Sequence, residues 1–310
     1  MPVLNVAHIT TYAYRQPVAL GEHRLMVRPR ESYDQQLLDA RIDIDPAPSE
    51  LRWLHDVFGN AVAIACFEGT TSHLTIAAHA TLDHRPSAVD AFALESYARR
   101  YPFTYSSEDM PDLARSIERQ HHDPDRVVDR WARGFIGDEG RIETTVLLAS
   151  MTRAVHRDFT YVGRSEPGTQ SPFETLARRQ GTCRDFAVLM IEAARALGLA
   201  ARFVSGYVYN PSQGDARTGG GADNQENAGR ARGGGNTHAW VHVFLPGSGW
   251  VEYDPTNGIV GNRGLIRVAV ARDPYQAVPL SGTWTGFPGS DAGMGVAVTV
   301  TVDHQEDAPC

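Results

Sequence analysis

A cysteine stands where a helix is expected to begin. Residues 181–186 read Gly-Thr-Cys-Arg-Asp-Phe, and the apolar stretch AVLMIEAARALG follows directly. Thr182 and Asp185 have the spacing of a capping box, which predicts a helix that starts at Cys183. The free N–H groups and the positive dipole end at a helix start lower the pKa of a thiol. Cys183 is therefore a candidate nucleophile, although a lone cysteine is also a common buried packing residue.

A histidine and an aspartate can supply the other groups that a cysteine nucleophile needs. His238 opens a predicted strand over residues 237–245, and Asp254 closes the next one over residues 249–255. The Pro-Gly-Ser-Gly turn between them makes these strands antiparallel neighbours, so the imidazole and the carboxylate can meet. A base accepts the thiol proton, and a third group fixes the tautomer of that base. Taken singly, His238 is a structural strand residue and Asp254 a turn former before Pro255, but their joint occurrence favours a Cys-His-Asp triad.

The hydrophobic pattern divides the chain into a β-rich start and an α+β core. Residues 1–86 alternate apolar and polar side chains between turn signals, which predicts a β-sandwich-like N-terminal domain. Residues 87–170 carry apolar side chains at intervals of three and four, which is typical of helices leading into the core. Residues 171–303 are expected to form the catalytic core, in which the cysteine helix precedes antiparallel strands. Residues 304–310 are expected to form a tail.

A glycine-rich segment interrupts the predicted core. Residues 211–235 hold eight glycines in 25 positions and almost no apolar side chains, which indicates a flexible coil. Two interpretations stay open for this segment: a tolerated surface insertion, or a flap over a cleft.

Composition and charge argue against several classes of protein. The net charge of −8, from 37 acidic and 29 basic residues, argues against nucleic-acid binding, which depends on neutralising phosphates. No segment has the ~18 apolar residues of a membrane span, and no leader is recognised, so we expect a cytoplasmic protein without membrane association. Three separated cysteines form neither a disulfide framework nor a zinc motif. His238 and His242 lie ~13 Å apart along a strand, too far for one ion, so no metal or other cofactor is predicted.

Five stretches of the sequence carry a resemblance to a known family. GTCRDFAVLMIEAARALGLAARFVSGYVY and THAWVHVFLPGSGWVEYDPTNG resemble the core of the transglutaminase-like superfamily, whose fold is related to that of papain. HITTYAY with PVALGEHRLMVRPR, and the late RVAVARDPYQAVPLSGTWTG, are similar to the bacterial branch with an extra N-terminal β domain. The resemblance implies that Cys183 attacks an amide carbonyl, His238 transfers protons and Asp254 orients the imidazole. Arg184, His242 and the long insertion depart from the usual pattern, which bears on substrate preference, and no acidic calcium loop is visible.

The triad and the resemblance together predict thiol-dependent cleavage of a peptide or protein amide through a thioester. Water as the acceptor gives a cysteine peptidase or amidase, which we favour, and an amine acceptor gives transglutaminase-type crosslinking. A non-catalytic binding or scaffold protein that retains the fold is the alternative from another class. The backbone N–H of Cys183 is expected to donate to the oxyanion, while the second donor and the oligomeric state are not predicted. Candidate substrate-binding residues are Gln170, Tyr207 and Trp240.

Overall fold

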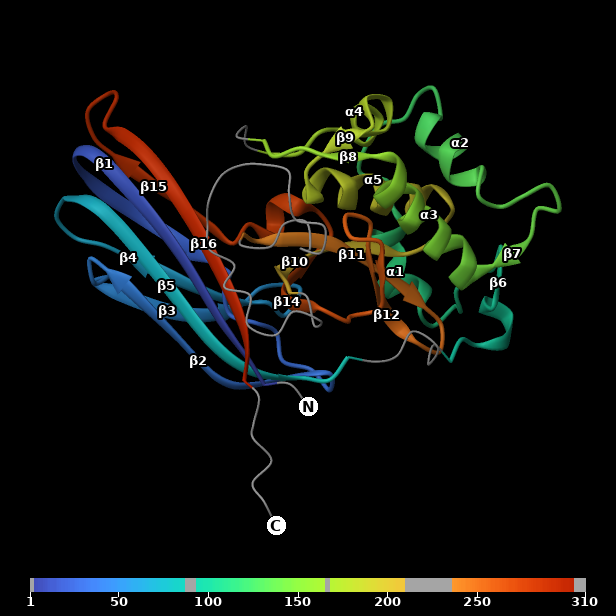
Figure 1. Ribbon diagram of the computed structural model, residues 1–310, viewed down its shortest axis with the longest axis horizontal. Helices are drawn as coiled ribbons and strands as arrows, with labels where there is room; N and C mark the ends of the chain where they lie inside the picture. The colour runs from blue at the N-terminus through green and yellow to red at the C-terminus, as the bar shows by residue number, and fades with distance from the viewer. Residues whose placement is uncertain (1–2, 87–92, 165–167, 210–235, 304–310) are drawn as a thin grey trace, which may run out of the picture.

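The computed structural model describes residues 3–86, 93–164, 168–209 and 236–303. The predicted insertion at residues 211–235 and the predicted tail at residues 304–310 lie outside the described residues. In the described part of the chain, a large β sheet occupies one end of the molecule, and helices pack on a second sheet at the other end (Figure 1). No helix in these ranges is long and apolar enough to cross a bilayer.

A seven-stranded antiparallel sheet is built around one long strand, β1 (Val3–Leu25). Its other strands are β2 (Gln35–Asp45), β3 (Glu50–His55), β4 (Ala61–Cys66), β5 (Thr71–His84), β15 (Leu280–Thr285) and β16 (Asp291–Asp303). The first part of β1 pairs mainly with β5 and β16, and its last part pairs with β4 and β15. Burial alternates along β5 and much of β1, as expected for strands with one face in a core.

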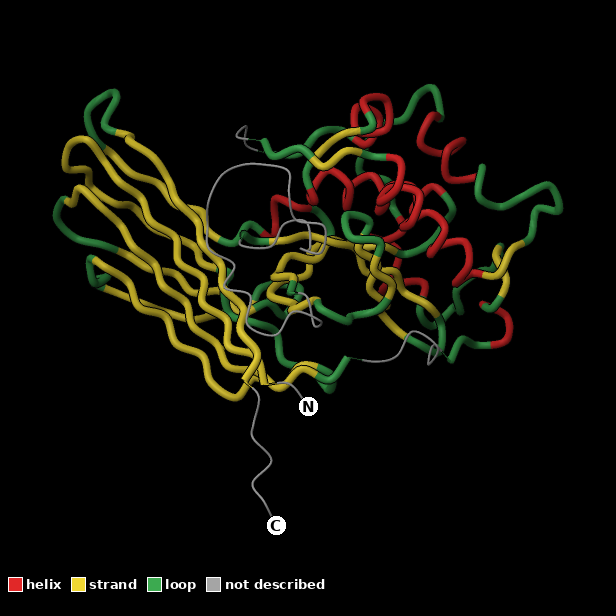
Figure 2. Tube along the Cα trace, in the orientation of Figure 1, coloured by secondary structure: helices red, strands yellow, loops and turns green. Residues whose placement is uncertain are grey.

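The seven-stranded sheet folds over itself through β1. Ala63 and Ala65 of β4 share a hydrophobic cluster with Leu74 and Ile76 of β5, although β4 and β5 pair with different parts of β1. The predicted β-rich N-terminal domain is confirmed. Its sandwich-like packing arises inside one continuous sheet rather than between two separate ones (Figure 2).

The last two strands of the chain extend the N-terminal sheet. The sequence pattern assigns residues 171–303 to one core, but β15 and β16 both pair with β1. β16 follows β1 from the pair Val3 and Asp303 to the pair Tyr14 and Asp291. An alternating pattern predicts a strand without specifying its partner. The range 171–303 predicted for the core therefore includes two strands that belong to the N-terminal sheet.

The second sheet and one buried helix form the core that the sequence predicts. The sheet has the order β13-β12-β11-β10-β14. Its strands are β10 (Ala201–Val208), β11 (His238–Leu245), β12 (Gly249–Asp254), β13 (Ile259–Val260) and β14 (Leu265–Ala271). Helix α5 (Cys183–Ala196) packs against β10 and β11. Phe186 of this helix shares the main hydrophobic cluster with Phe203 and Val241 of the sheet, so α5 is anchored on the strands that follow it.

Other helices and several short strands precede α5 in the described ranges. The helices are α1 (Met110–Ile117), α2 (Val127–Arg133), α3 (Thr144–Asp158) and α4 (Pro172–Arg178), with the 3-10 turns η2 (Ser96–Ala98) and, later in the chain, η3 (Pro274–Ala277). The short strands are β6 (Arg100–Tyr101), β7 (Ile142–Glu143), β8 (Thr160–Tyr161) and β9 (Gln180–Gly181). α1, α2 and α3 agree with the helical period of residues 87–170. The parallel pair β8 and β9 brings Tyr161 beside Gly181, directly before α5.

The two large sheets meet in a buried and hydrogen-bonded interface. Leu4 and Leu82 of the N-terminal sheet share a hydrophobic cluster with Ile266 of the core sheet. The side chain of Asn60 donates to the carbonyl of Val270 at 2.7 Å and accepts the Val270 N–H at 2.9 Å. Apolar contact and paired backbone groups therefore join the domains.

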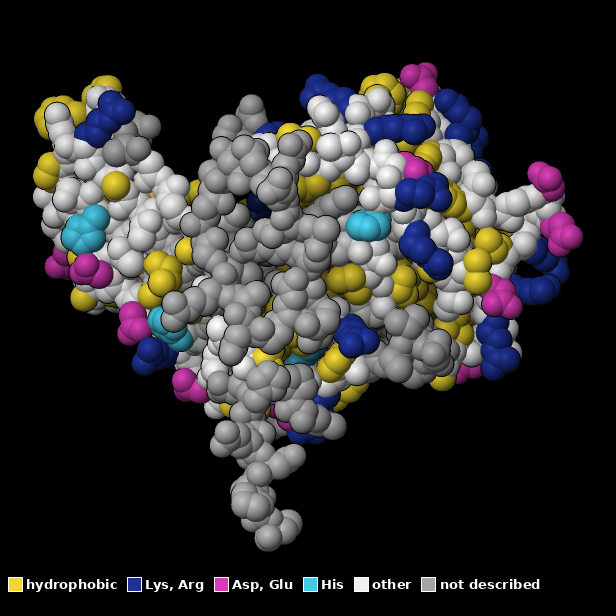
Figure 3. Space-filling view, viewed as in Figure 1, with side chains coloured by type: hydrophobic (Ala, Val, Ile, Leu, Met, Phe, Trp, Pro, Cys, Tyr) yellow, Lys and Arg dark blue, Asp and Glu magenta, His cyan; other side chains and the backbone are white. Residues whose placement is uncertain are grey.

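The basic side chains of the protein are all arginines, since the chain contains no lysine among its 29 basic residues. On the face shown in Figure 3 these side chains gather mainly over the helical end of the molecule, and fewer lie over the seven-stranded sheet.

Candidate active site

The predicted capping box holds the cysteine at the start of α5. Thr182 Oγ1 accepts the Asp185 backbone N–H at 3.4 Å, and Asp185 Oδ2 accepts the Thr182 N–H at 2.8 Å. The Asp185 side chain is fully buried, and its Oδ1 also accepts the Gln170 N–H at 2.6 Å. Cys183 is a free thiol, 4 % exposed, at the first helical position. A helix leaves the N–H groups of its first turn without backbone partners, so the N–H of Cys183 is a donor close to the sulfur.

His238 and Asp254 meet at the ends of neighbouring strands. His238 Nε2 lies 2.8 Å from Asp254 Oδ2, and both side chains are buried. Asp254 Oδ1 accepts the backbone N–H groups of Thr256 at 2.9 Å and Asn257 at 3.3 Å. These donors fix the carboxylate, and the carboxylate in turn orients the ring and places a proton on Nε2.

The Cys183 thiol and the His238 ring change each other's protonation. Nδ1 of His238 is buried and has no hydrogen-bond partner among the described residues, so it is the ring nitrogen that Asp254 does not occupy. Burial raises the pKa of Cys183, but hydrogen bonding to His238, the charge of His238 and that of Arg184 outweigh burial and lower it. Burial lowers the pKa of His238, but the Asp254 carboxylate and then the Cys183 thiolate raise it to about 10. Both shifts favour a thiolate–imidazolium pair.

A second histidine on β11 shows that a carboxylate partner alone does not raise a buried imidazole's pKa. His242 Nε2 lies 3.2 Å from Glu252 Oε1. Burial nevertheless lowers the pKa of His242 to about 4, because the positive charges of Arg202 and Arg267 oppose the effect of Glu252. Each histidine has its own carboxylate, and no cluster of metal-ligating side chains occurs within the described ranges.

Trp240, one candidate substrate-binding residue, lies against the histidine. Its ring stacks on that of His238 with centroids 5.9 Å apart, and its side chain is fully buried. A Cβ at Gly206, which pairs with His238 across the strands, would lie 2.0 Å from the Ile266 carbonyl oxygen and 2.7 Å from the Trp240 ring. Glycine at this position therefore lets the tryptophan lie flat beside the imidazole.

The other two candidates lie in different places. Gln170 adjoins the helix cap through its bond to Asp185, and its side-chain oxygen is buried without a hydrogen-bond partner among the described residues. Tyr207 is 2 % exposed in the cluster between the two sheets, and its hydroxyl lies 2.9 Å from His8 Nδ1. Tyr207 is therefore packed against the N-terminal sheet, and its role in substrate binding stays a prediction.

Two residues that the sequence pattern did not mark also lie here. Asn257 Nδ2 donates to Asp254 Oδ2 at 2.8 Å and lies 3.3 Å from His238 Nε2. Its position in the Asp-Pro-Thr-Asn-Gly turn indicated only a turn. Tyr161 has its pKa raised to about 12, first by burial and then by the Cys183 thiolate. Tyr161 reaches the cysteine through the pairing of β8 with β9, which no local signal predicts.

Two family models match the chain. Residues 4–83 match the bacterial transglutaminase-like N-terminal region, and residues 138–255 match the transglutaminase-like superfamily. The first range corresponds to β1 to β5, and the second contains Cys183, His238 and Asp254.

Two relatives and a solved structure are similar to the chain over most of its length. The Mycobacterium bovis protein Mb2599c is 29 % identical over 287 residues, 90 % of this chain and 86 % of the relative. The Mycobacterium leprae protein ML0607 is 25 % identical over 312 residues, 96 % and 98 % of the two chains. A Cytophaga hutchinsonii structure described as "a Putative Cysteine Protease" has a TM-score of 0.66 at 18 % identity, covering 97 % of this chain and 98 % of the other. This last likeness concerns the fold.

Proposed function

Because the chain belongs to the transglutaminase-like superfamily, we propose that it cleaves peptide or protein amides through a thioester on Cys183. The observation that carries the proposal is the coupling of thiol, imidazole and carboxylate at the start of α5. The pKa of the thiol is lowered while that of His238 is raised to about 10. With these shifts the Cys183 thiolate, which is the nucleophile, and the His238 imidazolium, which is the proton donor, are present together in one form of the protein.

Acylation begins with the thiolate. The Cys183 sulfur adds to the amide carbonyl, and the new oxyanion accepts the backbone N–H of Cys183 at the helix start. The imidazolium of His238 gives its proton to the departing nitrogen as the C–N bond breaks. An amine leaves, a thioester remains, and Asp254 stabilises the ring throughout.

Deacylation uses the neutral imidazole that acylation leaves behind. His238 takes a proton from water, the resulting hydroxide oxygen attacks the thioester carbonyl, and the C–S bond breaks to release a carboxylic acid. The sulfur leaves as thiolate, and the imidazolium is restored beside it. An amine in place of water would give a new amide and hence a transglutaminase-type transfer.

The absence of lysine makes it easy to distinguish by experiment whether water or an amine accepts the acyl group. All 29 basic residues are arginines, so the protein offers no lysine side chain to its own thioester. Apart from the α-amine of the chain's N-terminus, any amide product must then incorporate an amine that the experimenter adds or that the substrate contains. We propose hydrolysis as the main reaction and treat transfer as the outcome that such an amine would reveal.

Product analysis on a library of peptides and glutamine amides tests the proposal. The library is incubated with and without a small primary amine, and mass spectrometry compares ammonia or amine release with new amide products. We expect turnover by the wild type and by Cys66→Ser, a cysteine of β4 distant in sequence from the helix, but none by Cys183→Ser. Turnover that survives in Cys183→Ser would overturn the proposal, and absence of any product would favour a scaffold function.

A further inference from the structure

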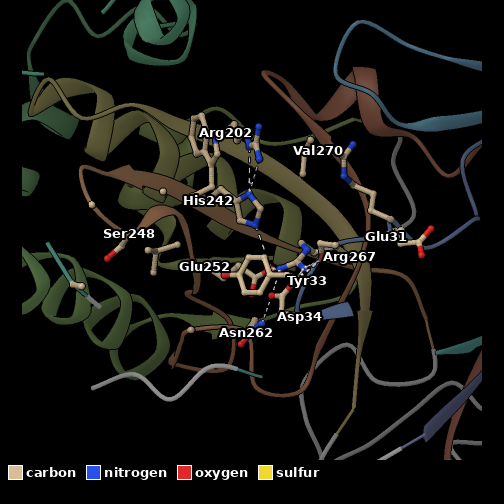
Figure 4. Close-up of a pocket in the computed structure, with 18 residues that line it drawn as sticks. Glu31, Tyr33, Asp34, Arg202, His242, Ser248, Glu252, Asn262, Arg267 and Val270 are labelled. Atoms are coloured by element: carbon tan, nitrogen blue, oxygen red, sulfur yellow. Dashed lines mark hydrogen bonds and ion pairs between the residues drawn. The ribbon is translucent and has the colours of Figure 1, made fainter. Parts of the chain in front are cut away.

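A cavity of about 490 Å³ lies between the N-terminal domain and the core, apart from the cysteine (Figure 4). Residues 30–34, which follow β1, form one wall, and the core sheet contributes the other. His242 is in this second wall and lies four positions along β11 from His238, which corresponds to ~13 Å. The polar and aromatic side chains of the core in this lining include those of Arg202, His242, Ser248, Trp250, Glu252 and Arg267.

Two of the carboxylates that line the cavity, Asp34 and Glu252, are already engaged by one arginine, whereas a third, Glu31, is exposed to solvent. Arg267 Nη1 lies 3.0 Å from Asp34 Oδ2 and 3.0 Å from Glu252 Oε1. Its Nη2 also donates to Asp34 Oδ1 and to Ser32 Oγ. These contacts neutralise Arg267, whose pKa is accordingly raised by Glu252 and Asp34 despite burial.

Arg202 has no such counter-ion. Its Nε and Nη2 donate to His242 Nδ1 at 3.3 and 3.2 Å, and its guanidinium lies 3.9 Å from the centre of the Trp250 ring. Among the described residues no carboxylate forms an ion pair with Arg202, and no acceptor meets its Nη1. Burial lowers the pKa of Arg202 to about 9, and the charges of Arg30 and Arg267 contribute. Arg202 is half-buried, and the charge of Glu252 offsets those of Arg30 and Arg267 only in part. A desolvated cation beside other cations is stabilised when an anion binds it.

Two further polar atoms of the lining are unpaired. Ser248 Oγ and Glu252 Oε2 are buried and have no hydrogen-bond partner among the described residues. Glu252 is only 2 % exposed, so its free oxygen requires a donor from inside the cavity. The hydroxyl of Ser248 can donate to an acceptor. The lining thus offers a cation and a hydroxyl for an acceptor, and a carboxylate oxygen for a donor.

We propose that this cavity binds a small organic carboxylate that also carries a hydroxyl or ammonium group. The ligand carboxylate accepts from Arg202 Nη1, and the hydroxyl or ammonium group donates to Glu252 Oε2. The volume is within the range of small-molecule sites, roughly 300 to 1,000 Å³, and the Trp250 ring supplies an apolar wall. The site uses none of the thiol machinery, so its occupancy can be tested independently of catalysis.

A three-carbon series that differs only at C2 tests the proposal on the full chain. Propionate, L-lactate and L-alanine are titrated by ligand-observed NMR, with inorganic phosphate as a fourth probe. We expect lactate or alanine to bind more tightly than propionate, since only they can donate to Glu252 Oε2. Binding of phosphate in preference to all three acids, or equal affinity for the three, would overturn the ligand class.

Variants locate the binding in this cavity. Arg202→Gln should weaken the binding of the best ligand by at least about tenfold. Arg41 on β2 has a side chain that is 66 % exposed, and Arg41→Gln should leave the affinity unchanged. Glu252→Gln should reduce the preference for lactate or alanine over propionate and serves as the deciding variant if Arg202→Gln does not fold. Absence of binding to the wild type, or unchanged binding of all three acids in both Arg202→Gln and Glu252→Gln, would overturn the proposal.

Discussion

Replacing His238 with glutamine should remove the charge that keeps the Cys183 thiol ionised. In the wild type, hydrogen bonding to His238 and the charge of His238 are the largest causes that lower the pKa of the thiol, while burial raises it. Glutamine has a similar reach but no charge. In His238→Gln burial is therefore expected to dominate, and the pKa of Cys183 should rise toward or above its ordinary value of 9.0.

The size of the effect at pH 7 follows from that change. A thiol with its ordinary pKa of 9.0 is only about 1 % ionised at pH 7, so the loss of thiolate is about 100-fold, and larger if burial carries the pKa above 9.0. A thiolate of higher pKa is also a better nucleophile, with a Brønsted coefficient of about 0.4 to 0.5, and this recovers roughly tenfold of the lost rate. We therefore expect alkylation to be at least roughly tenfold slower in His238→Gln than in the wild type.

Iodoacetamide alkylation followed by intact mass measures this rate. The proteins carry Cys66→Ser and Cys310→Ser, so that the signal reports Cys183 alone, and the rate is recorded across a pH series. His23→Gln is the matched control, because His23 is also buried, 4 % exposed, but its Nδ1 contacts the Gly21 carbonyl. Equal rates and equal pH midpoints in the wild type and His238→Gln, with native folds, would refute the reasoning.

Three further predictions concern the carboxylate, the pH profile and the helix cap. Asp254→Asn should lower amide turnover at least about 100-fold, because the ring loses its preferred tautomer and its charge; near-wild-type kcat/KM in a folded variant would contradict this. The wild-type kcat/KM should be retained at neutral pH and fall as the pH rises through about 10, since the imidazolium of His238, with its pKa raised to about 10, protonates the leaving amine; a fall centred near 6.5, the ordinary histidine value, would be inconsistent. Thr182→Ala should reduce the free energy of unfolding by about 1 kcal/mol in urea titrations and also slow alkylation of Cys183. Ser171→Ala, which removes the equivalent capping box of α4, should cost stability without slowing alkylation, and equal slowing in both would contradict a local effect of the cap.

Local rules account for the parts of the site that the sequence predicts. The capping boxes of α4 and α5 depend on residues three positions apart, so their spacing alone places Cys183 at the start of its helix. The meeting of His238 with Asp254 depends on a short turn between two strands, which limits how those strands can pair. Both features therefore follow from neighbouring residues.

Features that depend on distant pairing were not predictable from local patterns. The strand pattern at residues 280–303 does not reveal that β15 and β16 join β1. The packing of Tyr207 against the N-terminal sheet and the pairing of Tyr161 with Gly181, just before the cysteine, both depend on segments distant in the sequence. Arg202 likewise has no local signal for its lack of a counter-ion. In each case the environment of the side chain is set by a segment far away in the chain.

Direct detection of the acyl-enzyme tests the central claim most closely. Wild-type protein is mixed with a turned-over peptide amide, quenched in acid within the first turnovers, and examined by intact mass and peptide mapping. Our account predicts a transient adduct with the mass of the acyl group, attached through a thioester to Cys183 and removed by hydroxylamine. Turnover without any adduct on Cys183, or an adduct on another residue, would contradict it.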